Sequence, residues 1–172
     1  MTSLANGAAR IVPITIDLAA GYREALGVVA RERHYLRLTD APSLERSLAF
    51  VSANIAKGNP HLVALAEGNV VGWCDISRDD VTAESHVGSL GMGVIPTFRG
   101  QGIGRHLITA ALAAADAADF HRVELRVYSR NVTAIALYES VGFVHEGRLR
   151  DAIRRDDGYD DILIMGRLKP QR

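Results

Sequence analysis

The sequence has very little of several residue types on which common structural and functional classes depend. Its 172 residues include one cysteine, Cys74. Without a second cysteine there can be no internal disulfide and no cysteine pair for zinc or redox chemistry. The longest stretch without Asp, Glu, Lys or Arg, Ser85–Phe98, has 14 residues and includes three glycines and a proline. A membrane-spanning helix needs about 20 apolar residues, so we expect no membrane association.

Neither sign of charge is in excess. The chain has 20 basic and 20 acidic side chains, with a formal net charge of zero. A broad nucleic-acid-binding surface needs net positive charge to displace counterions from phosphates, so we expect no nucleic-acid partner. Asn6, Arg10, Pro13 and Asp17 interrupt any apolar run near the N-terminus, so we expect no signal peptide and a cytoplasmic location.

The composition that is present suits one folded unit. Apolar residues make up 48% of the chain and charged residues 23%, a mixture that can bury a core. At this length we expect a single domain over residues 1–172, with its core at about 10–168.

Apolar periodicity and turn residues predict an alternation of helices and strands. The face formed by Leu44, Leu48, Val51 and Ile55 has helical spacing, whereas Val123, Leu125 and Val127 alternate as in a strand. Asp17 and Asn131 can cap helices. We expect an α/β (α+β) fold with a single mixed, mostly antiparallel central sheet flanked by helices. Its strands are predicted at Arg10–Ile16, His61–Ala66, Val70–Ser77, Val87–Ile95, Arg122–Tyr128, Phe143–Arg154 and Asp160–Leu168, and its helices at 17–33, after Pro42, after Gly104 and from Asn131 to Gly142.

A glycine-rich turn carries the strongest chemical signal. Gly100, Gly102 and Gly104 join a predicted strand to a predicted helix, with Arg99 and Arg105 beside them. The first N–H groups of a helix have no partner within the helix, and they lie at the positive end of its dipole. Bare backbone at this place can therefore bind a phosphate or pyrophosphate. A flexible turn without a ligand is the alternative.

Two common nucleotide motifs are excluded by the spacing. A Walker loop needs Gly-Lys-Ser/Thr, and the only lysines are Lys57 and Lys169. A dinucleotide fingerprint needs a third glycine three residues after the second, and those positions hold Arg105 and Leu107.

The turn resembles a known family. Arg99-Gly100-Gln101-Gly102-Ile103-Gly104 is similar to the Arg/Gln-x-x-Gly-x-Gly/Ala signature of the GNAT superfamily of N-acetyltransferases, and Asn131-x-x-Ala134-x-x-Leu137-Tyr138-x-x-x-Gly142-Phe143 resembles its second characteristic segment. The order of elements agrees over nearly the whole chain. Within the superfamily, Gly72-Trp73 and Gly158-Tyr159 look like the phosphinothricin and amino-acid N-acetyltransferase branch.

This resemblance implies that the chain binds acetyl-CoA. The backbone of Arg99, Gly100, Gln101, Gly102, Ile103, Gly104 and Arg105 would hold the pyrophosphate, and the strand Met92, Gly93 and Val94 would pair with the pantetheine amides. The same strand is expected to splay from Arg122–Tyr128. Gly91 and Gly93 would let the ligand approach closely. Ala134 and Asn131 are further cofactor-binding candidates.

Transfer of an acetyl group from a thioester to an amine needs a donor for the oxyanion, a proton for the thiolate and a base for the ammonium. Tyr138 is the candidate proton donor, although a tyrosine packed in the core is the alternative. Asn131 can both cap its helix and bond the cofactor. A backbone N–H near Met92 or Gly93 is the candidate oxyanion donor.

The base is where the sequence departs from the family pattern. Many members carry a glutamate at about the position of Gly88. The candidates here are Glu32, Asp75 and His86, with Glu84 two residues before His86, each with a surface or structural role as the alternative. A water chain to a remote carboxylate would also serve. Trp73 or Tyr159 could cover the apolar part of the acceptor. The six histidines form no i, i+4 pair and have no cysteine at zinc spacing, so no metal is expected.

The favoured hypothesis is an enzyme that acetylates a primary amine of a small polar acceptor by direct attack in a ternary complex. A protein N-terminal or lysine acetyltransferase keeps the chemistry and changes the acceptor. A non-catalytic acyl-CoA-binding sensor keeps the glycine turn alone. A homodimer is possible in each case.

Overall fold

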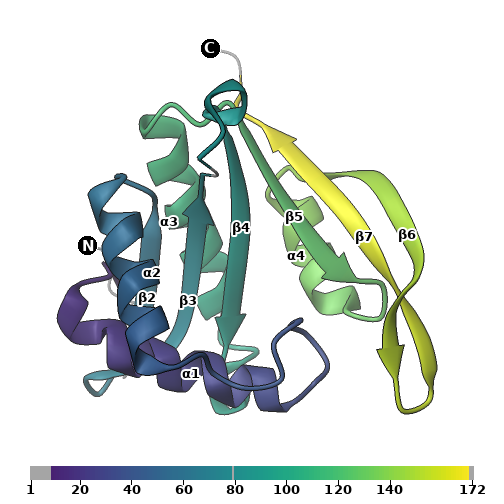
Figure 1. Cartoon of the computed structure of the whole chain (residues 1–172), viewed down its shortest axis with the longest axis horizontal. Coiled ribbons are helices and arrows are strands. Elements are labelled where there is room, and N and C mark those ends of the chain that lie inside the picture. The colour runs from purple at the N-terminus through teal and green to yellow at the C-terminus, as the bar shows by residue number, and fades with distance from the viewer. Residues whose placement is uncertain (1–8, 79, 171–172) are drawn as a thin grey trace. The chain divides into compact units, whose positions relative to one another are not determined.

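The computed structural model describes residues 9–78 and 80–170. The described chain forms seven strands and four α-helices in the predicted order, shown in Figure 1. The strands are β1 (Arg10–Pro13), β2 (His61–Ala66), β3 (Asn69–Ser77), β4 (Val87–Val94), β5 (Arg122–Tyr128), β6 (Val144–Arg155) and β7 (Gly158–Leu168), and the helices are α1 (Ala19–Arg31), α2 (Leu44–Ala56), α3 (Ile103–Ala117) and α4 (Val132–Ser140).

The strands form one mixed sheet in the order β1-β2-β3-β4-β5-β7-β6. β4 and β5 are parallel, with Val87–Ser89 opposite Arg122–Glu124, and the pairs β1–β2, β2–β3, β5–β7 and β6–β7 are antiparallel. The predicted mixed, mostly antiparallel sheet flanked by helices is therefore confirmed.

The chain divides into two compact units. The first comprises residues 1–77 and 91–118, and the second comprises residues 78–90 and 119–172. β4 changes unit between Leu90 and Gly91, so each unit is described below by itself. The predicted splay of β4 from β5 stays a prediction.

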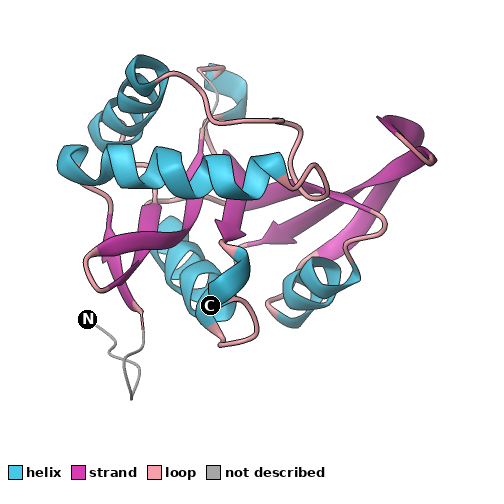
Figure 2. Ribbon diagram, turned by 90° about the horizontal axis from the view of Figure 1, so that it is seen from below, coloured by secondary structure: helices cyan, strands magenta, loops and turns pink. Residues whose placement is uncertain are grey.

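In the first unit, β3 is buried on both faces. Residues 70–76 are all buried, because α1 and α2 cover one face of these strands and α3 covers the other (Figures 1 and 2). A Cβ built on Gly72 would lie 3.2 Å from Cδ1 of Leu107 on α3, whereas the neighbouring Trp73 ring packs against Tyr22 on α1. A strand covered on both sides reads as a continuous apolar run instead of an alternating one.

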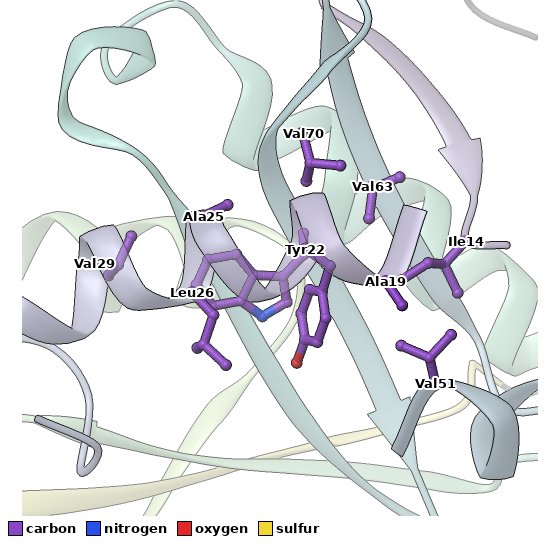
Figure 3. Packing of buried hydrophobic residues seen from close by; sticks show 10 residues of the cluster. Ile14, Ala19, Tyr22, Ala25, Leu26, Val29, Val51, Val63 and Val70 are labelled. Atoms are coloured by element: carbon purple, nitrogen blue, oxygen red, sulfur yellow. The ribbon is translucent and has the colours of Figure 1, made fainter. Parts of the chain in front are cut away.

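A hydrophobic cluster joins α1 and α2 to this sheet. Tyr22 projects from α1 into the cluster beside Ala19 and Leu26, as Figure 3 shows, and Val51 reaches it from α2. The Tyr22 and Trp73 ring centroids are 5.8 Å apart in an edge-on arrangement. Aromatic pairs with this geometry add about 1 kcal/mol beyond the buried area.

The start of α1 differs from the prediction. Asp17 does not cap it: Asp17 lies in a 3₁₀ turn, Ile16–Leu18, and the residue at the N-cap is Leu18, with no side-chain cap. The tight turn is closed by the Leu18 N–H, which donates to the Thr15 carbonyl, so the helix begins two residues after Asp17. The strand predicted over Arg10–Ile16 ends at Pro13 for the same reason.

Most other boundaries agree closely with the sequence. Glu67 and Gly68 connect β2 to β3 with positive φ angles of 51° and 81°, as a two-residue hairpin turn requires. On α2, Ser43 caps the helix, and of the predicted apolar face Val51 is buried while Leu44 and Ile55 are exposed. The predicted apolar face of α2 is therefore wider than the part of the helix that is buried.

In the second unit, β7 lies between β5 and β6. The long β6–β7 hairpin turns at Asp156–Asp157 and has register shifts between His145 and Gly147 and between Leu149 and Ile153. Three ion pairs join some of its interleaved charges to one another or to the neighbouring loop. The pairs are Arg148–Asp161, Arg155–Asp160 and Arg130–Asp157.

The contact between Trp73 and β4 yields a stability prediction. A Cβ on Gly93 would lie 2.7 Å from Cζ3 and 2.9 Å from Cζ2 of Trp73. Because the ring is packed against α1, we expect Gly93→Ala to lower the free energy of unfolding by about 1–3 kcal/mol, as overpacking does. Gly147→Ala is the control, since its Cβ would meet Ile164 at an ordinary 3.6 Å. Urea unfolding measures both, and equal stability of the two variants would contradict the prediction.

Candidate functional site

The predicted phosphate-binding turn has the backbone conformation that glycine allows. Gly100 and Gly102 have φ angles of 74° and 79°, in the left-handed region that side chains disfavour. Both residues are exposed, and nothing lies within 4 Å of a Cβ built on Gly100. The backbone of this turn is thus open to the surface.

Gly102 is the N-cap of α3. The helix is held in place by Ile103, which is buried at its first position. The His106 N–H donates to the Gly102 carbonyl at 3.1 Å, so the helical hydrogen bonding begins at His106. The first N–H groups of α3, beginning at Ile103, have no acceptor within the helix. They and the helix dipole can hold an anion.

Arg99, at the start of the turn, is hydrogen-bonded to β4 and to the end of α1. Its Nε donates to the Val94 carbonyl at 2.8 Å, and its two terminal nitrogens donate to the Glu32 carboxylate at 2.8 and 2.5 Å. Its guanidinium carbon lies 4.9 Å from the centre of the Tyr35 ring. The hydrogen bonds to Glu32 raise the pKa of Arg99. Its charge is therefore already paired with the carboxylate of Glu32.

Glu32 lies at the end of α1, and its carboxylate forms this bidentate ion pair. It is fixed as a partner of Arg99, so the geometry favours a structural role over that of a base. Arg31 forms an exposed ion pair with Asp40, 2.7 Å long. Exposed pairs contribute little free energy and exchange readily. The loop after α1 is thus held at Glu32 and Tyr35.

Asp75 is a buried carboxyl group on β3. It is 7% exposed and accepts a hydrogen bond from Ser77 at 3.4 Å. Burial raises the pKa of Asp75 to about 7, and the hydrogen bond from Ser77 opposes this only in part. Because the folded-state pKa is raised, the folded protein binds this proton more tightly than the unfolded chain does. The stability that the protonated Asp75 carboxyl contributes is therefore lost as the pH rises from about 4 to about 7.

His61 lies opposite Asp75 in the β2–β3 register. Burial lowers the pKa of His61 to about 4, so the ring is neutral near pH 7. Its Nδ1 is 3.3 Å from the Asn54 amide nitrogen. Because this folded-state pKa is lowered, the stability that the neutral ring contributes is lost as the pH falls from about 6.5 to about 4.

Trp73 and Cys74 both belong to the core. Trp73 is 2% exposed and packs between Tyr22 and Gly93, and its role in covering the apolar part of the acceptor stays a prediction. Gly93 is needed to admit this ring. Cys74 is fully buried, and burial raises the pKa of its thiol, so it is inert as a nucleophile.

Four of the predicted residues, Asn131, Tyr138, His86 and Tyr159, lie in the second unit. Asn131 caps α4, its side chain accepting from the Ala134 N–H at 3.3 Å, so its predicted capping role is confirmed. Tyr138 is 8% exposed, and its ring centroid is 5.9 Å from that of Phe143. His86 is exposed beside His121, and Tyr159 is exposed at the start of β7. The cofactor role of Asn131 and the catalytic role of Tyr138 stay predictions.

Among residues 9–78 and 80–170, no group of three or more His, Cys, Asp or Glu side chains is arranged to hold a metal ion. In the same part of the chain, no helix is long and apolar enough to cross a membrane.

The sequence did not reveal two of these arrangements. The pairing of Arg99 with Glu32 joins residues 67 positions apart, and no local pattern announces it. The setting of Asp75 had a weaker signal, because it is the one charged residue among the apolar residues of Val70–Ile76.

Comparison with known proteins agrees with this geometry. Residues 28–143 match the model of the Acetyltransferase (GNAT) family. An L-amino acid N-acetyltransferase of Escherichia coli K12 is 31% identical over 113 residues, which are 65% of this chain and 70% of that protein. The N-alpha-acetyltransferase RimI of Mycobacterium tuberculosis is 38% identical over 105 residues, 59% of this chain and 62% of that protein.

A solved structure shares the fold. The phosphinothricin acetyltransferase of Sinorhizobium meliloti, in complex with acetyl-CoA, superposes with a TM-score of 0.87 at 21% identity, over 94% of this chain and 89% of that one. Because the family match extends from α1 through the glycine turn to the end of α4, this protein belongs to the GNAT family of acetyltransferases, as an acetyl-CoA-dependent N-acetyltransferase.

Proposed function

We propose that this enzyme acetylates the primary amine of a small polar acceptor, an amino acid or a compound like one, by direct attack in a ternary complex. The observation that carries the proposal is the exposed turn at Gly100 and Gly102, where positive φ angles keep the backbone bare at the start of α3. That arrangement suits a pyrophosphate, the group that distinguishes coenzyme A from simpler acyl donors.

The residues of the turn fit coenzyme A. A side chain at Gly100 would fill the open space beside the backbone, which is where an anion would approach the N–H groups of α3. Arg99 is held by Glu32, so the backbone and the helix dipole carry the recognition, with Arg105 exposed nearby. The bound thioester supplies the activated acetyl group.

Two residues of the second unit complete the proposal. Tyr138 donates a proton to the departing thiolate, and Asn131 bonds the cofactor while it caps α4. Both roles follow from the match of this segment to the family pattern. Ala134 and the backbone of Met92, Gly93 and Val94 complete the proposed cofactor contacts, and the N–H of Met92 or Gly93 would stabilise the oxyanion.

The acceptor is proposed from the curated relatives. The E. coli relative is named as an L-amino acid N-acetyltransferase, which supports a small acceptor carrying a carboxylate. The M. tuberculosis relative is named as an N-alpha-acetyltransferase, which supports a protein N-terminus as the second candidate. Both acceptors present a primary amine, and they differ in what surrounds it.

An assay of free-thiol release separates these acceptors. Purified protein and acetyl-CoA are mixed with amino acids, amino-acid methyl esters, polyamines, aminoglycosides or N-terminal peptides. We expect turnover with at least one free amino acid and a loss of turnover with its methyl ester. Turnover confined to peptides would overturn the small-acceptor proposal and favour the second candidate. The absence of turnover, together with coenzyme A binding, would favour a sensor.

The turn yields a binding prediction. Gly102→Val places a branched side chain where phosphate must meet the backbone, so we expect coenzyme A affinity measured by calorimetry to fall at least tenfold, about 1.4 kcal/mol. Gly68→Val is the matched control, because Gly68 has a similar φ of 81° in the β2–β3 turn. It carries the same backbone strain without the proposed ligand. Equal affinities of the two folded variants would contradict the site.

Tyr138 yields a kinetic prediction. Tyr138→Phe keeps the ring that contacts Phe143 and removes the phenolic proton. We expect kcat to fall about 10²-fold, as for a lost general acid, while coenzyme A affinity is preserved. Unchanged turnover, under conditions where chemistry limits the rate, would show that Tyr138 acts only in packing.

A further inference from the structure

The carboxylate of Asp75 lies against the backbone of β4. A Cβ built on Gly91 would be 3.3 Å from Oδ1 and 3.6 Å from Oδ2 of Asp75. No side chain stands between them, because the residue on β4 is glycine. Trp73, two residues earlier on β3, lies against Gly93 in the same way. Side chains from β3 therefore take the places that two side chains of β4 would otherwise occupy.

This placement brings an acid to a strand that lacks one. The residues of β4 before the turn are Val87-Gly88-Ser89-Leu90-Gly91-Met92-Gly93-Val94, with no ionisable side chain. Asp75 supplies the carboxylate from the neighbouring strand at Gly91. Gly91 adjoins Met92 and Gly93, whose backbone N–H groups are proposed above to face the thioester.

Among the ionisable groups near Asp75, the pKa values of the others are shifted away from neutral pH. Tyr22 on α1 has a pKa raised by burial and by the negative charge of Asp75. His61 on β2 has a pKa lowered to about 4 by burial, and Cys74 on β3 has a raised pKa. The Ser77 hydroxyl donates a hydrogen bond to the Asp75 carboxylate at 3.4 Å. At pH 7 the first three are neutral, whereas the pKa of Asp75 is about 7, where a general base works best.

We propose that Asp75 is the general base of the reaction, accepting a proton from the ammonium group of the acceptor beside Gly91. The proposal rests on the acetyl transfer proposed above. The Asp75 carboxylate takes one proton from R-NH₃⁺ and later passes it to water. The neutral amine attacks the thioester carbonyl, so a C–N bond forms and the C–S bond breaks. The leaving sulfur is protonated by the Tyr138 phenol, and the phenolate regains a proton from the positively charged nitrogen of the tetrahedral intermediate, which leaves the neutral amide.

The proposal ranks the three candidates for the base. Glu32 is held by a bidentate ion pair with Arg99, and a carboxylate that already accepts two hydrogen bonds from one guanidinium is poorly able to take a proton. His86 is exposed, so its environment does not shield it from solvent as that of Asp75 does. Asp75 combines burial, a single neutral hydrogen-bond donor in Ser77 and contact with the β4 backbone.

The test is the variant Asp75→Asn, which keeps the shape and removes the basic oxygen. For the wild type we expect kcat/KM to rise with pH through about 7, as the carboxyl loses its proton. For Asp75→Asn we expect this inflection to vanish and kcat/KM to fall 10²-fold or more at pH 8. With acceptor amines of decreasing pKa, the deficit of the variant should shrink, because a less basic amine needs less help. If Asp75 had a purely structural role, the deficit of the variant would not depend on the pKa of the acceptor amine.

Three measurements apart from turnover keep the outcomes distinct. Coenzyme A affinity should agree within twofold between Asp75→Asn and wild type; no affinity in either protein would overturn the proposed function itself. Thermal unfolding should show that the wild type becomes less stable from pH 4 to pH 7 because of Asp75. The variant should lack the part of this pH dependence that comes from Asp75. Ser77→Ala removes the hydrogen bond that favours the carboxylate, so its kcat/KM inflection should move to higher pH.

An Asp75→Asn variant with normal kcat/KM and an unchanged pH profile would overturn the proposal. If that variant does not fold, Ser77→Ala decides alone: an inflection that stays at the wild-type pH would overturn the assignment.

Discussion

The contact between the Trp73 indole and Gly93 is the constraint on which the first unit depends. A ring of this size fits against β4 only because Gly93 has no side chain. The same ring meets Tyr22 of α1, so one residue connects the helix layer, β3 and β4. Since interiors are packed to crystalline density, the position of β4 at the glycine turn follows from this contact.

The same close approach explains why Asp75 lies where it does. Successive residues of a strand point to opposite faces, so Asp75 shares a face with Trp73 and lies two residues farther along β3. The indole covers Gly93 and the carboxylate covers Gly91. Burying an uncompensated carboxylate is unfavourable, and the raised pKa of Asp75 expresses that cost. Such costs are typical of functional sites, and here the cost produces a group that gains and loses its proton near neutral pH.

The Arg99–Glu32 ion pair gives the turn a second support. It joins the start of the glycine turn to the end of α1, and Tyr35 packs on the guanidinium. A charge that is already paired adds little attraction for a phosphate. The anion recognition proposed for this turn would therefore depend on backbone N–H groups and on the α3 dipole, beside the left-handed conformations of Gly100 and Gly102.

The sequence by itself determined the order of the elements, the β2–β3 hairpin, the glycine turn and the cap of α4 by Asn131. Each of these depends on the backbone preferences or periodicity of residues close in the chain. It did not determine that Arg99 is paired with Glu32, that Trp73 is a core residue or that Asp75 is the buried acid beside β4. Those properties come from contacts between residues far apart in the chain, such as Glu32 with Arg99, and the burial, pKa and charge of a side chain depend on all of its neighbours in space. Only the tertiary structure decides which neighbours those are.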